Sequence, residues 1–287
     1  MKKLLYFGPE GSYTQRAMNI AKDMLGLDDY AVEPCAHIND VILQIDENEQ
    51  YIGVIPIENS IEGVVRETVD KLVRTNNYVR IFQEVIIPVS HCLCNSTGDI
   101  SKVRKIISHP QALAQCNGYI TELRKRLGVN IEVSSVASTS YAAKSLIDLD
   151  ETYAAISSPE TAQVYGQRVL ETSINDEKDN KTRFICIGRT YPKQTGNDRT
   201  SIAFTTLNRP GALVDVLSVL KEFDLNMSHI DSRPSKKILG EYMFYIDIDG
   251  HIEDAKVKTA FEKIKPYITF YRLLGAYPKY KEEVNNV

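Results

Sequence analysis

The first 190 residues of the chain alternate short apolar runs with segments whose apolar residues recur at helical spacing. Leu4–Phe7 and Ile52–Ile57 are typical of strands, whereas Glu62–Arg74 places Val65 and Val69 on one face of a helix. Strands that alternate with helices in this way predict largely parallel sheets with helices on both faces. We therefore expect an α/β region over residues 1–190.

The same reading predicts the other elements of this region. Strands are expected at Tyr30–Pro34, Val103–Ser108, Ile131–Val136, Ala154–Ser157 and Phe184–Gly188, and the stretch Val79–Cys94 is expected to be rich in strand. Helices are expected at Ser12–Leu25, Asn39–Asp46, Ala112–Leu127, Ser140–Leu149 and Glu160–Tyr165.

The stretch Tyr191–Arg199 breaks this rhythm, since it holds Pro, Gly, Asn and Asp and almost no apolar residues. We expect it to be a linker between domains. After it come strands at Thr200–Leu207, Met227–Ser232, Glu241–Ile248 and Thr269–Ala276, and helices at Gly211–Phe223 and Val257–Tyr267. This βαββαβ order predicts a ferredoxin-like domain over residues 200–280.

Composition excludes several classes of protein. A net charge of −4 and the lack of a long basic run speak against binding of nucleic acid. No segment reaches the roughly 20 apolar residues of a membrane helix, and the first apolar run is too short for a signal peptide. The five cysteines are odd in number and show no Cys-x-x-Cys spacing, which supports neither a zinc site nor a disulfide framework. We expect a reducing, cytoplasmic setting.

Thr182 and Arg183 stand together at the mouth of the expected strand Phe184–Gly188. The hydroxyl can donate or accept a hydrogen bond, and the guanidinium can hold a carboxylate through two parallel bonds. The pair indicates a site for a small anion with an oxygen to be handled. The alternative for Arg183 is a structural ion pair.

Polar residues also follow other expected strands. Glu58 and Asn59 end one buried strand, and Ser108 ends the strand before the helix that carries Gln115. Thr139 stands directly before the expected helix Ser140–Leu149. Ligands of open α/β sheets bind outside the carboxyl ends of strands, so these residues are candidate ligand contacts. The alternative is that they cap the helices that follow.

Two further residues allow a functional and a structural interpretation. Ser12 follows a glycine turn at the start of a helix, where free backbone amides attract anions, although it can equally be a plain N-cap. His109 permits a general-base role. A lone histidine beside a turn, with no acidic residue at fixed spacing to orient it, is more often structural.

No set of His, Asp and Glu residues has the spacing of a metal site. The chain also lacks a Gly-x-Ser-x-Gly nucleophile elbow and the lysine pattern of a phosphate-binding loop. Strand ends carry hydroxyl and amide side chains instead. We therefore expect chemistry that runs on hydrogen bonding and charge placement, with no metal and no cofactor.

Four segments, in order, resemble the successive motifs of prephenate dehydratases: Phe7–Tyr13, Gly53–Ser60, Ser108–Cys116 and Asn180–Phe184. In the tail, Arg209–Leu213 and Asp231–Pro234 resemble that family's ACT regulatory domain. The resemblance implies a periplasmic-binding-protein-like catalytic region of two α/β lobes with a cleft between them. It also implies that the ferredoxin-like tail is an ACT domain.

The resemblance implies a carbon–oxygen lyase that converts prephenate to phenylpyruvate, water and carbon dioxide without a cofactor. Thr182 is then the residue that assists departure of the C4 hydroxyl group, directly or through a relay. Arg183 is the candidate for a substrate carboxylate. The other residues predicted to bind substrate are Asn59, Ser108, Gln115, Glu58, Ser12 and Thr139.

The ACT resemblance implies inhibition by L-phenylalanine, bound where two ACT domains meet, and hence a homodimer or homotetramer. The predicted effector residues are Gly211, Ala212, Leu213, Asn226, Asp231, Ser232 and Arg233. Asp231 stands where the family usually has Glu, and the shorter carboxylate can weaken the effector site or change its preference. The alternative for Gly211–Leu213 is a plain helix start after Pro210.

Two rival functions stay open on the sequence. An arogenate dehydratase runs the same chemistry on the aminated substrate. A non-catalytic amino-acid sensor would bind in the cleft and signal through the tail, but the retention of Thr182 within the full set of motifs argues against it.

Overall fold

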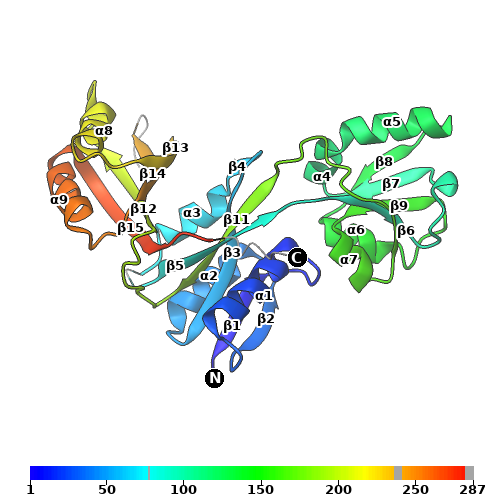
Figure 1. The fold of residues 1–287 in the computed structure, drawn as a ribbon, viewed down its shortest axis with the longest axis horizontal. Coiled ribbons are helices and arrows are strands. Elements are labelled where there is room, and N and C mark those ends of the chain that lie inside the picture. Colours follow the sequence, from blue (N-terminus) through cyan, green and yellow to red (C-terminus); the bar gives the residue numbers. More distant parts are fainter. Residues whose placement is uncertain (77, 236–240, 282–287) are drawn as a thin grey trace.

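The computed structural model describes residues 1–76, 78–235 and 241–281. Figure 1 shows three bodies along the longest axis: the ACT-like C-terminal domain, lobe 1 in the middle, and lobe 2 at the other end. The chain builds most of lobe 1, crosses to lobe 2, returns to complete lobe 1 with β11 (Lys181–Gly188), and then forms the C-terminal domain. The predicted two-lobed α/β region is confirmed.

Besides β11, lobe 1 contains β1 (Lys3–Phe7), α1 (Tyr13–Leu25), β2 (Ala31–Cys35), α2 (Ile38–Glu47), β3 (Tyr51–Asn59), β4 (Gly63–Val64), α3 (Arg66–Leu72) and β5 (Arg80–Pro88). Lobe 2 contains β6 (Cys92–Asn95), a 3₁₀ turn (Ile100–Lys102), β7 (Lys105–Ser108), α4 (Pro110–Gln115), α5 (Asn117–Leu127), β8 (Glu132–Ser135), α6 (Thr139–Ser145), β9 (Tyr153–Ser157), α7 (Pro159–Val164) and β10 (Arg168–Glu171).

The C-terminal domain contains β12 (Asp198–Thr206), α8 (Ala212–Glu222), β13 (Met227–Pro234), β14 (Tyr242–Asp249), α9 (Ala255–Ile264), a 3₁₀ turn (Lys265–Tyr267) and β15 (Ile268–Pro278). The predicted βαββαβ order is confirmed. Residues 191–197 join β11 to β12 without helix or strand. The domain limits at 190 and 200 stay predictions.

One sheet runs through lobe 1 and the C-terminal domain, in the order β13-β14-β12-β15-β5-β11-β3-β1-β2. Lobe 2 has its own sheet, ordered β10-β6-β9-β7-β8. The expectation of largely parallel sheets is wrong. β11 lies antiparallel to both β3 and β5, and β6 lies antiparallel to β9 and β10, because each is built where the chain crosses between lobes in the reverse direction.

The two faces of the lobe 1 sheet bury different partners. On one face α1 supplies Ala17, Met18 and Ala21 to a core that includes Phe184. The opposite face packs on α2 and α3, and the same core contains Tyr245 and Tyr277 of the C-terminal domain. The C-terminal domain is therefore fixed to lobe 1 by shared apolar burial, on the face opposite α1.

The predicted helix Glu62–Arg74 starts later than expected. The side-chain Oδ1 of Asn59 accepts hydrogen bonds from the amides of Ile61 and Glu62, both at 3.0 Å, which holds them in a turn. Gly63 follows with φ +79°, a conformation that suits glycine and stops a helix from starting there. α3 consequently begins at Arg66.

The predicted helix Ala112–Leu127 is broken into α4 and α5. The carboxylate of Asp176 accepts hydrogen bonds from the amides of Gly118 and Tyr119, at 2.9 and 3.2 Å, and so caps a second helix start. Asp176 is distant in sequence, which is why periodicity alone missed the break. The short exposed strand β10 was also not predicted.

Within the residues that the structure describes, no helix combines the length and the apolar character needed to cross a membrane.

Gly275 sets how closely the C-terminal domain approaches lobe 1. It pairs with Ile81 at the one β15–β5 register position, and a Cβ built on it would lie 2.1 Å from the Ile81 carbonyl oxygen. We predict that Gly275→Ala lowers the free energy of unfolding by about 1–3 kcal/mol, because backbone cannot yield as a side chain can.

Chemical denaturation measures this loss. Gly188→Ala is the matched control, since its Cβ would come closest to a ring atom of Phe82, at 3.1 Å, and would lie 3.6 Å from the nearest backbone atom, the Tyr51 carbonyl oxygen. A Gly275→Ala protein no less stable than Gly188→Ala would contradict the prediction.

Candidate active site

A cavity of 740 Å³ lies between lobe 1 and lobe 2. Lobe 1 contributes the loop after β1 and the end of β2, and lobe 2 contributes the starts of α4 and α6. Val89, His91 and Asn180 reach it from the two segments that join the lobes. A ligand in this cavity therefore touches both lobes and both crossings.

A chain of hydrogen bonds runs along the cavity wall. Asn59 Nδ2 donates to Thr182 Oγ1 at 2.9 Å and to Asn180 Oδ1 at 2.7 Å. Asn180 Nδ2 donates to Gln115 Oε1 at 3.2 Å. All four residues line the cavity, and Gln115 comes from lobe 2 whereas Asn59 comes from lobe 1. The chain therefore links the two lobes through neutral amides.

The direction of the bond to Thr182 is fixed by the backbone. Asn59 Oδ1 accepts from two amides in the turn that follows, so Asn59 Nδ2 is the atom that faces Thr182. Since Nδ2 only donates, Thr182 Oγ1 accepts. The hydroxyl proton of Thr182 is then available to a second acceptor, such as a ligand oxygen in the cavity.

His91 extends the chain at its far end. Its Nε2 lies 3.2 Å from Gln115 Oε1, and the side chain is almost fully buried. Burial lowers the pKa of His91, against the hydrogen bond to Gln115, which raises it. A neutral ring with its proton on Nε2 donates to Gln115, so this oxygen accepts from two sides and its amide is held in one orientation.

Ser12 and Thr139 lie on the cavity lining at the starts of α1 and α6. Ser12 Oγ accepts from the Gln15 amide at 3.3 Å, so its hydroxyl acts as the N-cap of α1. The neighbouring Ser138 caps α6 in the same way. Both positions combine a capping role with a place beside the cavity.

Ser108 and His109 mostly serve the fold. Ser108 is fully buried, and its Oγ donates to the Ile156 carbonyl at 2.6 Å, which ties β7 to β9. His109 lines the cavity, but its Nδ1 accepts from the Gln111 amide at 3.3 Å and caps α4. This hydrogen bond supports the structural interpretation of His109.

The described residues that line this cavity include no lysine and no arginine. Nor do His, Cys, Asp and Glu side chains gather in groups of three or more anywhere in residues 1–76, 78–235 and 241–281 in a way that could hold a metal ion. The described lining thus offers no lysine or arginine to a negatively charged ligand, and Glu10 adds a carboxylate to it.

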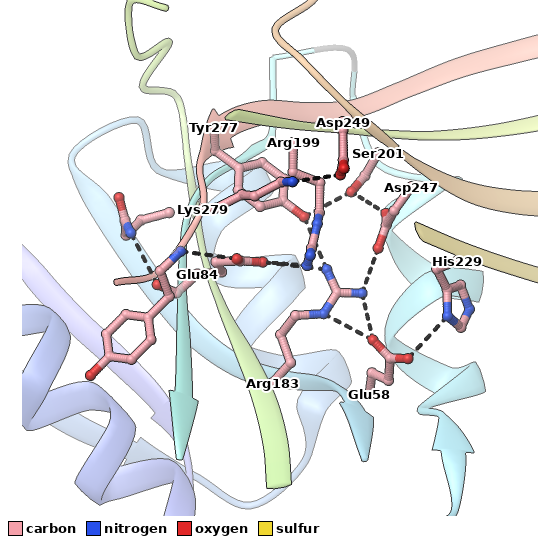
Figure 2. A network of polar contacts seen from close by, with 12 residues as sticks. Glu58, Glu84, Arg183, Arg199, Ser201, His229, Asp247, Asp249, Tyr277 and Lys279 are labelled. Carbon is pink, nitrogen blue, oxygen red and sulfur yellow. Dashed lines mark hydrogen bonds and ion pairs between the residues drawn. The ribbon is translucent and has the colours of Figure 1, made fainter. Parts of the chain in front are cut away.

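Arg183 and Glu58 do not line the cavity but belong to a charged network on the other face of the sheet (Figure 2). The charged network consists of Arg183, Glu58, Glu84, Arg199, His229 and Asp247. Arg183 is 5% exposed and bonds Asp247 at 2.6 Å and Glu58 at 2.8 Å. The predicted contact of Arg183 with a substrate carboxylate does not fit this placement, because the guanidinium is already saturated by protein carboxylates. The alternative of a structural ion pair fits it.

The predicted effector residues occupy separate places in the C-terminal domain. Gly211, Ala212 and Leu213 line a cavity of 270 Å³ at the start of α8, facing Tyr242 and Phe244 of β14. Asn226 lies past the other end of α8, where its Nδ2 donates to Asp249 Oδ2 at 2.9 Å.

The remaining predicted effector residues lie on β13. Asp231 and Ser232 pair with Tyr245 and Phe244 of β14, and neither is among the described residues that line the 270 Å³ cavity. Arg233 forms an ion pair with Asp70 of α3 beside another cavity, of 360 Å³. Within one chain these residues do not make a single pocket.

Comparison with known proteins identifies the family. The family model described as prephenate dehydratase matches residues 4–192, which is more than half of the chain, and the ACT domain model matches residues 200–266. The chain belongs to the prephenate dehydratase family.

Named relatives agree with this membership. The prephenate dehydratase of Methanocaldococcus jannaschii is 39% identical over 284 residues, which cover 96% of this chain and 98% of that protein. The bifunctional chorismate mutase/prephenate dehydratase of Aquifex aeolicus is 36% identical, over 96% of this chain and 74% of that protein. A solved prephenate dehydratase from Arthrobacter aurescens, in complex with L-Phe, has a TM-score of 0.84 and 32% identity, over 96% of this chain and 90% of that one.

The sequence analysis missed Asn180 and His91 as candidate functional residues of this family member. Asn180 begins the Asn180–Phe184 motif, but its partner Gln115 is distant in sequence, so its role is visible only after folding. The signal available in the sequence was an asparagine shortly before an expected strand. His91 carried no motif signal at all.

The charged network predicts how stability depends on pH. Burial raises the pKa of Glu58, but the hydrogen bond from His229 and the charge of Arg183 outweigh burial and lower it from 4.5 to about 2. Because the folded-state pKa lies below the unfolded-state value, ionised Glu58 stabilises the fold above pH 4.5. This contribution is lost as the pH falls from 4.5 towards 2.

Glu58→Gln removes this charge at every pH. We predict that it lowers the free energy of unfolding strongly at about pH 7 and much less at about pH 3, as measured by urea denaturation. Glu67→Gln, at an exposed position on α3, is the control and should show little change at either pH. An equal loss for Glu58→Gln at both pH values would contradict the assignment.

Proposed function

We propose that the protein converts prephenate to phenylpyruvate, water and carbon dioxide, as a lyase of L-phenylalanine biosynthesis. The observation that carries this proposal is the hydrogen-bonded chain Thr182–Asn59–Asn180–Gln115 on the wall of the interlobe cavity. Membership of the prephenate dehydratase family supports it independently.

The reaction removes a carboxylate and a hydroxyl group from opposite ends of a cyclohexadiene ring. The bond from C1 to the carboxylate carbon breaks and leaves its electron pair in the ring, while the C4–oxygen bond breaks and that oxygen takes up a proton. The product ring is aromatic, which supplies the driving force without a cofactor. The barrier lies in expelling hydroxide, so the enzyme has to donate to the departing oxygen.

Thr182 is the donor that we assign to the departing oxygen. Its Oγ1 accepts from Asn59, which leaves the hydroxyl proton for the substrate. A threonine hydroxyl is a very weak acid and donates only as the C–O bond breaks; its oxygen takes a proton back from solvent before the next turnover. A positioned donor of this kind contributes about 10²- to 10⁴-fold, and the rest comes from holding the ring in its reactive shape.

A lining without cationic side chains suits the decarboxylation. An ion pair would stabilise the ring carboxylate in the ground state but not the neutral carbon dioxide, and so would raise the barrier. The described lining offers neutral donors instead. We assign the substrate carboxylates to backbone amides near Ser12 and Thr139, at the starts of α1 and α6.

We further propose that L-phenylalanine inhibits the enzyme from the ACT domain. The 270 Å³ cavity beside Gly211–Leu213 is large enough for an amino acid, and the related Arthrobacter aurescens structure contains L-Phe. Because Asn226 lies past the opposite end of α8, it can complete this cavity only from a second copy of the chain. The effector site thus requires paired ACT domains.

A homodimer is the smallest assembly that provides this pairing, and a homotetramer contains it twice. β13 supports pairing because it bonds only β14 among the described strands and leaves its other edge open. The five cysteines are all buried free thiols, which supports a reducing, cytoplasmic setting.

A direct assay separates this function from its rivals. Purified protein receives prephenate or arogenate in separate reactions, and phenylpyruvate or phenylalanine is detected by ultraviolet absorbance after chromatography. We expect phenylpyruvate from prephenate. Turnover of arogenate alone would favour the arogenate dehydratase, and turnover of neither would favour the amino-acid sensor.

Thr182 gives the sharpest test of the mechanism. We predict that Thr182→Ala lowers kcat by about 10²-fold or more and leaves the melting temperature close to wild type, whereas Thr182→Ser stays within about tenfold of wild type. Steady-state kinetics on the purified variants measures both. Near wild-type turnover of Thr182→Ala would overturn the assigned role.

The effector site predicts a second outcome. Calorimetry should show heat when L-phenylalanine is added to wild type, and Gly211→Val should weaken that binding by about tenfold or more, because φ +79° at Gly211 strains a β-branched residue. Gly128→Val is the matched control, since Gly128 also has positive φ, at the end of α5 in lobe 2. Wild type without heat would contradict regulation by phenylalanine.

A further inference from the structure

Thr182 and Arg183 occupy consecutive rungs of one antiparallel ladder. Thr182 pairs with Asn59, and Arg183 pairs with Glu58. Successive side chains of a strand point to opposite faces, so the first rung faces the interlobe cavity while the second faces the ACT domain. The Thr182–Asn59 pair is thus adjacent in sequence to Arg183 and Glu58, whose charges the proposed chemistry does not use.

The second rung takes its shortest charge contact from the ACT domain and not from lobe 1. Arg183 bonds Glu58 and, more weakly, Glu84 from lobe 1, but its shortest contact is Asp247 of β14, at 2.6 Å. Asp247 and Glu84 are each 1% exposed, so water cannot replace these contacts. Taking away one partner from such a cluster leaves an uncompensated buried charge.

Glu58 is held from the ACT domain as well. Its Oε1 lies 3.0 Å from His229 Nδ1, on β13 (Figure 2). Asp247 pairs in register with Ser201 of β12 on one side and His229 of β13 on the other. Ser201 Oγ donates to Asp247 Oδ1 at 2.5 Å. Ser201, Asp247 and His229 thus form a row across three ACT strands, in which Asp247 bonds Arg183 and His229 bonds Glu58.

The pairing of β11 with β3 is irregular directly after the two rungs. A register shift lies between Arg183 and Phe184, directly after the charged rung. Such a bulge interrupts regular pairing and lets the strand end bend. On its other side β11 stays in register with β5 from Lys181 to Cys186, so the irregularity affects only the pairing of the two rungs with β3.

Two ACT strands connect the charged network to the effector cavity. β14 contributes Tyr242 and Phe244 to the cavity lining and Asp247 to the charged network. β12 contributes Thr206 to the lining and Arg199 to the charged network. A ligand that displaces β14 at the cavity acts on a strand whose Asp247 bonds Arg183, and one that displaces β12 acts on a strand whose Arg199 bonds Glu84, a neighbour of Arg183.

We propose that Arg183 and Glu58 are positioning residues through which the ACT sheet sets the geometry of the Thr182–Asn59 pair. Turnover then depends on where β13 and β14 hold the Arg183–Glu58 rung, and phenylalanine inhibits by changing that position. The effector part rests on the proposed function, whereas the positioning part needs only the dehydration itself.

His229 offers the cleanest variants, since it lies in the ACT domain and its Nε2 has no hydrogen-bond partner among the described residues. His229→Leu removes the donor to Glu58, and His229→Asn restores a donor near the position of Nδ1. Lys263→Gln is the matched control, because it breaks an ion pair with Glu222 on the outer helices of the same domain.

Each protein is measured in three ways: kcat and KM for prephenate, phenylalanine affinity by calorimetry, and maximal inhibition. For His229→Leu we expect kcat to fall about threefold to tenfold with KM and phenylalanine affinity within about twofold of wild type, and maximal inhibition to fall below about half. His229→Asn should recover most of both losses, and Lys263→Gln should match wild type. Ser201→Ala, which removes the donor to Asp247, is expected to show a smaller loss of the same kind and serves if His229→Leu does not fold.

Failure of this proposal is distinguishable from failure of the proposed function. A wild-type protein that makes phenylpyruvate and is inhibited, beside a His229→Leu protein with the same kcat and the same inhibition, overturns the positioning role. A loss that His229→Asn does not recover, or that Lys263→Gln shares, also overturns it. Wild type that makes no phenylpyruvate overturns the proposed function itself.

Discussion

The antiparallel insertion of β11 between β3 and β5 is the contact on which the rest of the structure depends. The chain reaches this strand only after it has built the whole of lobe 2. Its pairing with β3 and β5 therefore completes the sheet of lobe 1. The same pairing brings Thr182 beside Asn59 and Arg183 beside Glu58. The Thr182–Asn59 pair at the interlobe cavity and the Arg183–Glu58 pair at the ACT domain therefore depend on the same strand pairing.

Electrostatics divides the two faces of this ladder. On the cavity face the described side chains include hydroxyls, amides, two histidines and the carboxylate of Glu10 but no lysine or arginine, which suits a substrate that brings its own negative charges and loses one as carbon dioxide. On the other face three carboxylates surround Arg183, which is 5% exposed; Glu84 and Asp247 are each 1% exposed, and Glu84 also pairs with Arg199. Buried ion pairs of this kind hold a geometry well but tolerate displacement poorly. Such a cluster is suited to transmitting the position of one domain to another.

The sequence predicted much of the strand–helix order, the two-part organisation and, at the cavity wall, Ser12, Asn59, Gln115, Thr139 and Thr182, because these depend on local periodicity and on motifs that end strands. It did not predict the direction of β11, since pairing between distant segments leaves no local signal. The break at Cys116 depends on Asp176, and the place of Arg183 depends on Asp247; both partners are remote in sequence. Arg183 was assigned to the substrate because it stands next to Thr182. Neighbouring residues of a strand point to opposite faces, and the partners of Arg183 on its face come in part from the ACT domain, which the sequence did not place there.

The central claim is that Asn59 acts on the reaction through Thr182, by leaving the threonine proton free for the departing oxygen. A double-mutant cycle on kcat for Asn59→Ala and Thr182→Ala tests this most directly. The account predicts that the double variant is hardly slower than the slower single variant, because the second change removes nothing that the first left working. Losses that multiply in the double variant would show that the two residues act independently, and would contradict the claim.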